Sequence, residues 1–240
     1  MIRAAITMRV VQAPDYDEPR DALSHDWLDR AAQWDMTPFP VPNAGAAAVD
    51  ILKSISPDLL VLSGGEDPGV NERRDNTESA LLDYALKTGL PILGVCRGLQ
   101  FINVRMGGTL CDVTGHVARD HSLTFADPWH AYYGATANVN SYHNKSIERR
   151  GLADGLEVTA VDGDGHVEAA RVANRPVAAV MWHPERGAAL DGARHIQPMP
   201  QADRWMPPIA RTWRENAAAG LAASSWTSHA SAIIASDSVG

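Results

Sequence analysis

Short apolar runs alternate with amphipathic stretches through the first half of the chain. The runs contain almost no polar residues, which is typical of strands buried on both faces of a sheet. The stretches between them repeat apolar residues at helical spacing. The expected strands are residues 4–8, 36–41, 58–62 and 91–95, and the expected helices are residues 20–34, 46–55, 75–88 and 99–106. This alternation predicts an open, mostly parallel α/β sheet flanked by helices, with ligands bound at the carboxyl ends of the strands.

The pattern changes after Cys111. Residues 116–138 show no period and are rich in His, Asp, Trp and Tyr, so we expect an irregular segment there. The proline-containing residues 10–19 are likewise expected to form a loop. Three later runs, separated by turn-forming residues, predict additional antiparallel strands in the C-terminal half. These runs are residues 156–161, 165–172 and 177–182.

Periodicity fades again after residue 187. The following residues are first proline-rich and then rich in Ala and Ser, and they show no core pattern. We therefore expect one compact domain over residues 1–187. Residues 188–240 are expected to form a C-terminal extension that is partly disordered.

The bulk composition narrows the range of functions. The chain of 240 residues has a formal net charge of −8 and so lacks the positive charge typical of nucleic-acid-binding proteins. No nucleic-acid partner is therefore expected. No apolar run is long enough to span a membrane, and the first residues lack the pattern of a secretory signal. Two cysteines, Cys96 and Cys111, are too few for a disulfide framework. We expect a cytoplasmic protein with reduced thiols and no membrane partner.

The sequence predicts neither a cofactor nor a metal. The G-x-G-x-x-G pattern of dinucleotide sites is absent after the first expected strand. Only one of the two cysteines could be spared for a structural metal, and no ligand set is evident. The chemistry is therefore expected to rest on protein side chains alone.

Residues 94–98 (Gly-Val-Cys-Arg-Gly) join a buried strand to a helix. The flanking glycines allow close backbone approach in a tight turn, the arrangement of a nucleophile elbow with Cys in place of Ser. The sulfur of Cys96 would lie at a helix N-terminus, where the dipole favours the reactive thiolate. The alternative is a small buried apolar side chain, as most free cysteines are.

Two further strand ends carry residues suited to act with such a cysteine. Residues 63–65 (Ser-Gly-Gly) follow a buried strand, and their N–H groups would form an oxyanion hole, although an ordinary glycine loop fits the same pattern. His183 follows the last expected strand and would activate Cys96, while Glu185 would orient the imidazole. Each signal is weak alone, but the three in this order favour cysteine catalysis.

With these motifs the chain resembles class I glutamine amidotransferases, and more closely their Peptidase C26 branch of γ-glutamyl hydrolases. Within that branch it is similar to the γ-glutamyl-γ-aminobutyrate and γ-glutamyl-CDP-amidate hydrolases. The likeness covers residues 1–187, which would form the catalytic domain, and it implies a flavodoxin-like fold. The motifs that carry it are residues 63–65, 93–100, 107–110, 140–144 and 182–185.

The resemblance implies a role for each matching residue. Cys96, His183 and Glu185 would form a catalytic triad. The backbone N–H groups of Gly65 and Arg97 would stabilise the tetrahedral oxyanion.

The resemblance also implies a set of residues that hold the glutamyl end of the substrate. Gln100 lies one helical turn after the nucleophile, and the segment around Tyr142 corresponds to the family's substrate-binding segment. A core role for Tyr142 fits almost as well as a binding role. The expected substrate contacts are Gln100, Ser141, Tyr142 and His143.

The front of the chain resembles hydrolases of sugar and capsule biosynthesis, one group of which cleaves γ-glutamyl-CDP-amidate. A phosphate-bearing leaving group would suit bidentate contacts from arginine. The alternative is that these arginines are ordinary solvated side chains. The expected leaving-group contacts are Arg9, Arg20, Arg73 and Arg74.

Three functions compete on this evidence. The first is cysteine-dependent hydrolysis of a γ-glutamyl amide, releasing glutamate through a thioester and acting on a small molecule. The second is the glutaminase component of an amidotransferase that delivers ammonia to a partner synthetase. The third, a non-catalytic binding module, is disfavoured because Cys, His and Glu are all present. A homodimer would be compatible with the first function.

Overall fold

The structure, a computed structural model, describes residues 1–127, 129 and 134–186. The chain divides into two units, Met1–Trp205 and Met206–Gly240, and all described residues belong to the first. The extension expected over residues 188–240 therefore lies outside the described residues.

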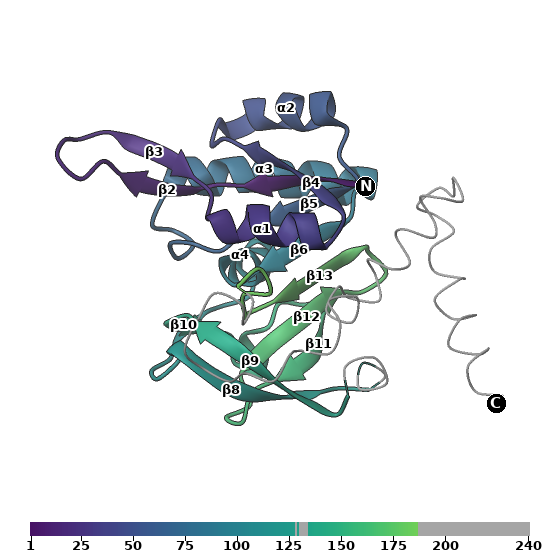
Figure 1. The fold of residues 1–240 in the computed structure, drawn as a ribbon. Helices are drawn as coiled ribbons and strands as arrows, with labels where there is room; N and C mark the ends of the chain where they lie inside the picture. The colour runs from purple at the N-terminus through teal and green to yellow at the C-terminus, as the bar shows by residue number, and fades with distance from the viewer. Residues whose placement is uncertain (128, 130–133, 187–240) are drawn as a thin grey trace. The chain divides into compact units, whose positions relative to one another are not determined.

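Strands and helices alternate up to α4, and strands dominate beyond it (Figure 1). The strands are β1 (Ile2–Thr7), β2 (Arg9–Gln12), β3 (Pro19–Ala22), β4 (Met36–Val41), β5 (Leu59–Leu62), β6 (Ile92–Val95), β7 (Cys111–Asp112), β8 (Val117–Phe125), β9 (Thr136–Tyr142), β10 (Lys145–Ser146), β11 (Leu156–Val161), β12 (Val167–Val172) and β13 (Val177–Val180). The helices are α1 (His25–Gln33), α2 (Ala48–Ile55), α3 (Glu72–Thr88) and α4 (Arg97–Arg105), with the 3-10 turns η1 (Gly45–Ala47) and η2 (Arg149–Gly151).

Nine strands form one sheet in the order β4-β1-β5-β6-β13-β12-β11-β8-β9. Neighbours from β4 to β13 are parallel, whereas pairing from β13 to β9 is antiparallel. β2 and β3 form a separate hairpin that follows the carboxyl end of β1. Because β5, β6 and β13 are adjacent and parallel, the residues that follow them meet at one edge of the sheet.

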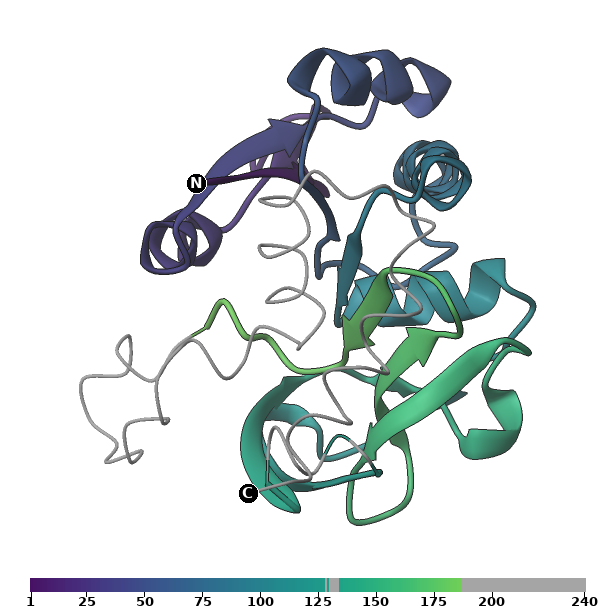
Figure 2. The same cartoon turned by 90° about the vertical axis from the view of Figure 1, so that its right-hand side faces the viewer.

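The parallel strands are covered by helices on both faces. Figure 2 shows α1 on one side of β1 and β4, and α2 and α3 on the other. Ala5 and Leu60 belong to the same buried cluster as Leu52 of α2 and Leu81 of α3. Alternating side chains of the same strands face the opposite way, as expected for strands buried on both faces.

In the parallel part of the sheet, the observed elements agree with those predicted from the sequence. Every strand and helix predicted there is present, and the predicted α/β class with antiparallel strands in the C-terminal half is confirmed. The helix expected from residue 75 starts earlier: α3 begins at Glu72, where the side chain of Asn71 accepts a hydrogen bond from the N–H of Arg74. Asn is among the best N-cap residues.

Two segments predicted to be irregular are strands instead. Residues 10–19 were expected to form a loop, but β2 and β3 pair there, and β3 also takes the start of the helix predicted over residues 20–34. These hairpin strands are exposed or half-buried throughout, so they lack the apolar alternation of a buried strand. Residues 116–138 contain β8 and the start of β9. Within the ranges described above, no helix is both long and apolar enough to cross a lipid bilayer.

Candidate active site

Cys96 lies in a strained turn between β6 and α4. Its backbone has φ 51° and ψ −103°, an unusual conformation for a residue with a side chain. A Cβ atom on Gly98 would collide with the carbonyl oxygen of Leu62, and one on Gly94 would lie 2.9 Å from the Cβ of Ala179. Both glycines are therefore required by close packing, as the elbow pattern predicts.

The candidate catalytic segments follow three adjacent parallel strands. The N–H of Cys96 donates to the carbonyl oxygen of Val180 at 2.8 Å, which ties the elbow to the end of β13. His183 follows β13 by three residues. A Cβ atom on Gly64, just after β5, would lie 2.7 Å from Cε1 of His183, so the glycine loop lies directly against the imidazole. The topology thus brings together the three motifs that the sequence analysis singled out.

His183 is held in one orientation by two neighbours. Its Nδ1 lies 2.6 Å from Oε1 of Glu185, and both side chains are buried. A ring proton on Nδ1 would leave Nε2 free to accept the thiol proton. Asn140 fixes the main chain: its side chain donates to the carbonyl oxygens of His183 (2.9 Å) and Arg186 (3.1 Å) and accepts from the N–H of His183 (2.8 Å).

Asn140 was not among the site residues predicted from the sequence. It belonged to the motif over residues 140–144, but nothing in the sequence indicates that its side chain reaches the turn at His183. The contact depends on the long-range packing of the segment after β13 against β9, which sequence spacing does not encode.

The resting Cys96 thiol is protonated. Burial raises the pKa of Cys96 to about 12, and the negative charge of Glu185 adds to this effect. A hydrogen bond from the backbone N–H of Arg97 acts in the opposite direction, as we expected at a helix N-terminus. Desolvation outweighs the helix terminus, so burial opposes the expected preference for thiolate.

A buried ion network supports the glycine loop. Arg74 is completely buried, and its guanidinium contacts Glu66 and Glu78 at 3.0 Å each. It also donates to the carbonyl oxygens of Ser63 (2.8 Å) and Gly64 (3.2 Å). These bonds fix the loop that was predicted to supply an oxyanion donor.

The same network reaches the elbow from the other side. The Arg97 side chain pairs with Glu78 and with Asp75, both on α3. Glu78 also accepts a hydrogen bond from the hydroxyl of Thr7 at 2.7 Å. The sequence analysis predicted a helix over residues 75–88 and assigned no role to its first turn. Glu78 contacts both Arg74 and Arg97, and so joins the loop that carries Gly65 to the elbow.

The residues expected to bind the glutamyl end have different surroundings. Gln100 is buried and donates to the carbonyl oxygen of Lys145 at 3.1 Å, while its Oε1 has no hydrogen-bond partner. The hydroxyl of Ser141 donates to the carbonyl oxygen of His116 at 2.7 Å. Tyr142 is 39% exposed and lies edge-on to the His183 ring at 5.7 Å, so it is not a core residue.

His143 faces away from solvent into the antiparallel half of the sheet. Its Nδ1 lies 2.9 Å from the carbonyl oxygen of Lys145, and its Nε2 lies 3.4 Å from Oε1 of Glu168. It contributes to a buried group of histidines and carboxylates. Four members of this group offer ligand atoms close enough together to hold a metal ion: His116, His121, Asp162 and Glu168.

The four arginines considered for the leaving group divide into two kinds. Arg9, Arg20 and Arg73 are exposed, and the Cβ of Arg9 lies close to Gly65. Arg74 is buried and fully engaged by protein groups. We therefore withdraw Arg74 as a substrate contact, because its guanidinium has no free face for a phosphate.

The other cysteine lies apart from these strand ends. Cys111 is in β7 and lines a cavity with residues such as Thr109 and Glu148. It is not preceded by a buried parallel strand, so it lacks the elbow geometry.

This fold, with three motif-bearing loops at one sheet edge, defines a class I glutamine amidotransferase-like protein. The solved structure of a GMP synthase component from Thermoplasma acidophilum aligns with a TM-score of 0.62 at 21% identity, covering 89% of this chain and 92% of that one. A glutamine amidotransferase structure from Thermotoga maritima aligns with a TM-score of 0.58 at 14% identity, covering 90% and 85%. At these identities the likeness concerns the fold.

The Peptidase C26 family model matches residues 28–185, more than half of the chain. The chain belongs to the Peptidase C26 family, as the motifs had indicated. It is 38% identical over 189 residues to a Mycobacterium tuberculosis protein named for glutamine amidotransferases, covering 66% of this chain and 58% of that protein. It thus spans less than two thirds of that relative. It is 27% identical over 204 residues to the γ-glutamyl-CDP-amidate hydrolase of Campylobacter jejuni, covering 80% and 94%.

Proposed function

We propose that this protein hydrolyses a γ-glutamyl C–N bond, with Cys96 as the nucleophile. The observation that carries the proposal is the 2.6 Å contact between His183 and Glu185 at the sheet edge that also holds the strained Cys96 elbow. An oriented imidazole beside an elbow cysteine is the arrangement required for nucleophilic catalysis. Membership of the Peptidase C26 family supports the same activity.

The first half of the reaction forms a thioester. The proton of the Cys96 thiol passes to His183 as the sulfur attacks the γ-carbonyl carbon. Negative charge develops on the carbonyl oxygen, and the backbone N–H groups of Gly65 and Arg97 would stabilise it. The C–N bond then breaks, the amine leaves with the proton from His183, and the γ-glutamyl group stays on sulfur.

The second half releases glutamate. Water gives a proton to His183 as its oxygen attacks the thioester carbon, and the same oxyanion donors stabilise the intermediate. The C–S bond breaks, and the sulfur regains its proton from His183. Since the pKa of the resting thiol is about 12, the Cys96 proton must be transferred during attack on bound substrate, rather than be lost beforehand.

The substrate is proposed to be a γ-glutamyl conjugate with an anionic leaving group, such as γ-glutamyl-CDP-amidate, or a γ-glutamyl amine. The similarity to the Campylobacter enzyme supports the first choice. Arg9 and Arg73 support it as well, since both are exposed. Arg9 lies beside Gly65, and Arg73 is on the first turn of α3, where its Nε donates to the carbonyl oxygen of Asn43 at 2.5 Å. Arg20 is exposed too, but its guanidinium contacts Glu18 and Tyr16.

The test is glutamate release by the purified protein. Glutamine, γ-glutamyl-γ-aminobutyrate, a γ-glutamyl polyamine and γ-glutamyl-CDP-amidate are offered separately, with Cys96→Ala as the control. We expect rapid release from at least one conjugate and little from glutamine. Release that persists in Cys96→Ala would contradict the proposed nucleophile.

A second function, the glutaminase component of an amidotransferase, is favoured by other relatives. The chain is 34% identical over 187 residues to the anthranilate synthase of Azospirillum brasilense, covering 77% of this chain and 24% of that protein. If no conjugate is cleaved while a glutamine-like electrophile still labels Cys96, a glutaminase that depends on a synthetase partner becomes the better account. A homodimer and a cytoplasmic location stay predictions.

A further inference from the structure

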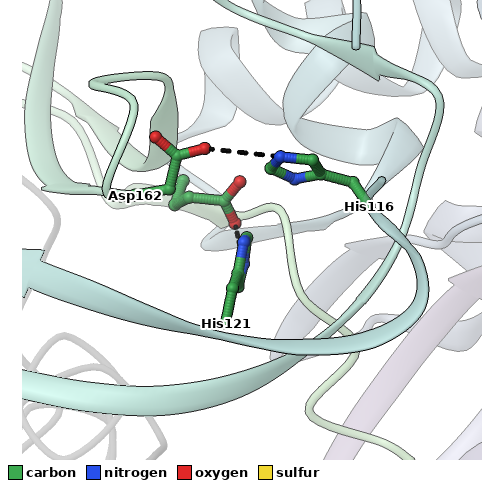
Figure 3. Close-up of side chains that lie close together, drawn as sticks. His116, His121 and Asp162 are labelled. Atoms are coloured by element: carbon green, nitrogen blue, oxygen red, sulfur yellow. Dashed lines mark ion pairs between the residues drawn. The ribbon is translucent and has the colours of Figure 1, made fainter. Parts of the chain in front are cut away.

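The antiparallel half of the sheet contains a second group of buried ionisable side chains. We call it the histidine cluster and define it by His116, His121, His143, Asp162 and Glu168. His121 is on β8, Glu168 is on β12, and the others flank β8, β9 and β11. Figure 3 shows His116 directed at Asp162, and His121 in an ion pair beside them. None of these residues belongs to the proposed triad.

The distances within the histidine cluster are too long for good hydrogen bonds. Nε2 of His121 lies 3.3 Å from Oε2 of Glu168, and Nε2 of His143 lies 3.4 Å from Oε1 of the same carboxylate. Nε2 of His116 lies 3.8 Å from Oδ2 of Asp162. N–H···O bonds are usually about 2.9–3.0 Å long.

Several buried polar atoms of the cluster consequently have no hydrogen-bond partner. They include both carboxylate oxygens of Glu168, which is completely buried, and the Nε2 atoms of His121 and His143. Leaving such atoms unsatisfied costs about 1–3 kcal/mol each, and more for charged groups. Because the ion pairs of Glu168 with His121 and His143 are long, a cation bound in the cluster would satisfy this carboxylate better than the imidazoles alone.

A divalent cation satisfies these atoms. Ligand atoms of tetrahedral Zn²⁺, with bonds of about 2.0–2.2 Å, are about 3.3–3.6 Å apart. The 3.3 Å contact between Nε2 of His121 and Oε2 of Glu168 matches this spacing. The ligand atoms of His116, His121, Asp162 and Glu168 all lie within 4.8 Å of one another. Nitrogen and oxygen donors without sulfur suit Zn²⁺ and its first-row neighbours.

Hydrogen bonds to protein groups already orient His143, which lies beside the candidate ligands, and the ligand Asp162. Nδ1 of His143 lies 2.9 Å from the carbonyl oxygen of Lys145, which assigns the ring proton to Nδ1 and leaves a lone pair on Nε2. Asp162 accepts hydrogen bonds from the N–H groups of Asp164 (3.0 Å) and His166 (2.8 Å) through Oδ1, and its Oδ2 lies 3.1 Å from Nδ1 of His166. Partners of this kind are typical of metal sites, where they fix ligand geometry.

We propose that the histidine cluster binds one Zn²⁺ or similar divalent transition-metal ion through His116, His121, Asp162 and Glu168, with His143 beside it. The site joins β8 to β12 and to the turn after β11, so the metal stabilises the antiparallel half of the domain. The sequence analysis expected no metal because it looked for cysteine ligands. These ligands are spread over four segments and converge only in the folded sheet.

The test is metal binding by full-length protein that has first been stripped with a chelator. Zn²⁺ is titrated against a competing dye, and Co²⁺ is added separately to record the visible spectrum of a nitrogen- and oxygen-ligated site. We expect one ion per chain and a higher Tm with metal. Repeating both titrations in Cys96→Ala excludes binding to the catalytic thiol.

Variants then locate the ion. His121→Asn and Glu168→Gln are expected to weaken Zn²⁺ binding at least tenfold, whereas His25→Asn, a matched change at an exposed histidine, leaves it unchanged. Wild-type protein that shows no saturable binding and no Tm change would overturn the proposal. So would equal binding by all variants. If a variant fails to fold, the wild-type stoichiometry and Co²⁺ spectrum still decide, and neither depends on the hydrolase activity.

Discussion

The two halves of the sheet each contain a group of buried charged side chains, but the two groups are satisfied to different degrees. In the parallel half, Arg74 meets Glu66 and Glu78 at 3.0 Å, and Arg97 pairs with Glu78 as well. In the antiparallel half, Glu168 meets its histidines at 3.3 and 3.4 Å, and both of its oxygens lack hydrogen bonds. In the first group one buried atom, Nε of Arg97, lacks a hydrogen bond, whereas in the second both oxygens of Glu168 and the Nε2 atoms of His121 and His143 lack one.

The buried charged side chains therefore have different roles in the two halves of the sheet. The network of Arg74, Glu78 and Arg97 balances opposite charges and so fixes the loops around Cys96. Buried pairs of this kind add little net stability but are costly to break. The histidine cluster presents lone pairs and negative charge in a region from which water is largely excluded, a suitable environment for binding a metal.

The largest expected effect concerns the nucleophile. Cys96→Ala should lower kcat by about 10⁴-fold or more, because triad members act as a unit. The matched change Cys111→Ala should leave kcat within about twofold, since Cys111 lacks the elbow geometry. Steady-state glutamate release measures both. A loss in Cys111→Ala comparable to that in Cys96→Ala would contradict the assignment.

Breaking the parallel-half network should produce the largest loss of stability. Glu78→Gln removes the charge between two buried arginines, so the free energy of unfolding should fall by about 3–5 kcal/mol in urea titrations. Glu72→Gln, at an exposed position of the same helix, is the control and should cost less than about 1 kcal/mol. Equal losses for the two variants would show that the network is unimportant.

Glu168→Gln, the corresponding change in the antiparallel half, tests whether the two buried groups differ in stability. In metal-free protein, Glu168→Gln should cost less than Glu78→Gln, because the contacts of Glu168 are long and replacing its charge relieves an unsatisfied carboxylate. With Zn²⁺ added, only the wild type should gain stability. A larger loss for Glu168→Gln than for Glu78→Gln in the metal-free state would reverse the proposed contrast.

The reactivity of the free thiol should depend strongly on pH. With a pKa of about 12, the thiolate fraction of Cys96 is about 1 in 10⁵ at pH 7 and grows about tenfold per pH unit. Alkylation of Cys96 by iodoacetamide should therefore rise about 100-fold from pH 7 to pH 9 without a plateau. Peptide mapping separates Cys96 from Cys111. A plateau below pH 8 would show that the resting nucleophile is a thiolate.

Replacing Glu185 should change the rate of alkylation and the rate of glutamate release in opposite directions. Its negative charge raises the pKa of Cys96, so Glu185→Gln should lower that pKa and speed alkylation. The same variant should slow glutamate release, because His183 loses the acceptor for its Nδ1 proton. Parallel loss of both rates would argue against the electrostatic account.

The smallest expected effect concerns Asn140. Asn140→Ala removes three hydrogen bonds to the turn that carries His183, so kcat should fall by about tenfold while KM changes little. Asn140→Asp keeps the acceptor for the N–H of His183 and should retain more activity than Asn140→Ala. Unchanged kcat in Asn140→Ala would remove Asn140 from the positioning residues.

The same contrast explains what the sequence could predict. Strands such as β5 and β6 are buried on both faces and appear as apolar runs, so the parallel half and the elbow at Cys96 were visible. On β8 the inward positions are His121, Leu123 and Phe125, and the polar histidine interrupts the alternation. The inward-facing His121 thus concealed β8 in the sequence, and the same histidine is one of the proposed metal ligands.

Contacts between distant segments could not be predicted either. Asn140 reaches His183 and Glu78 reaches Arg97 only because the sheet order brings their elements together. Sequence spacing reports which residues share a face of one element, and it carries no information on which elements become neighbours.

Covalent labelling of the full-length protein with an electrophilic glutamine analogue tests the central claim most directly. Intact mass and peptide mapping would locate the adduct. The account predicts one adduct per chain, on Cys96, formed in Cys111→Ala and prevented by a cleavable γ-glutamyl conjugate. An adduct on another residue, or equal labelling of Cys96→Ala, would contradict it.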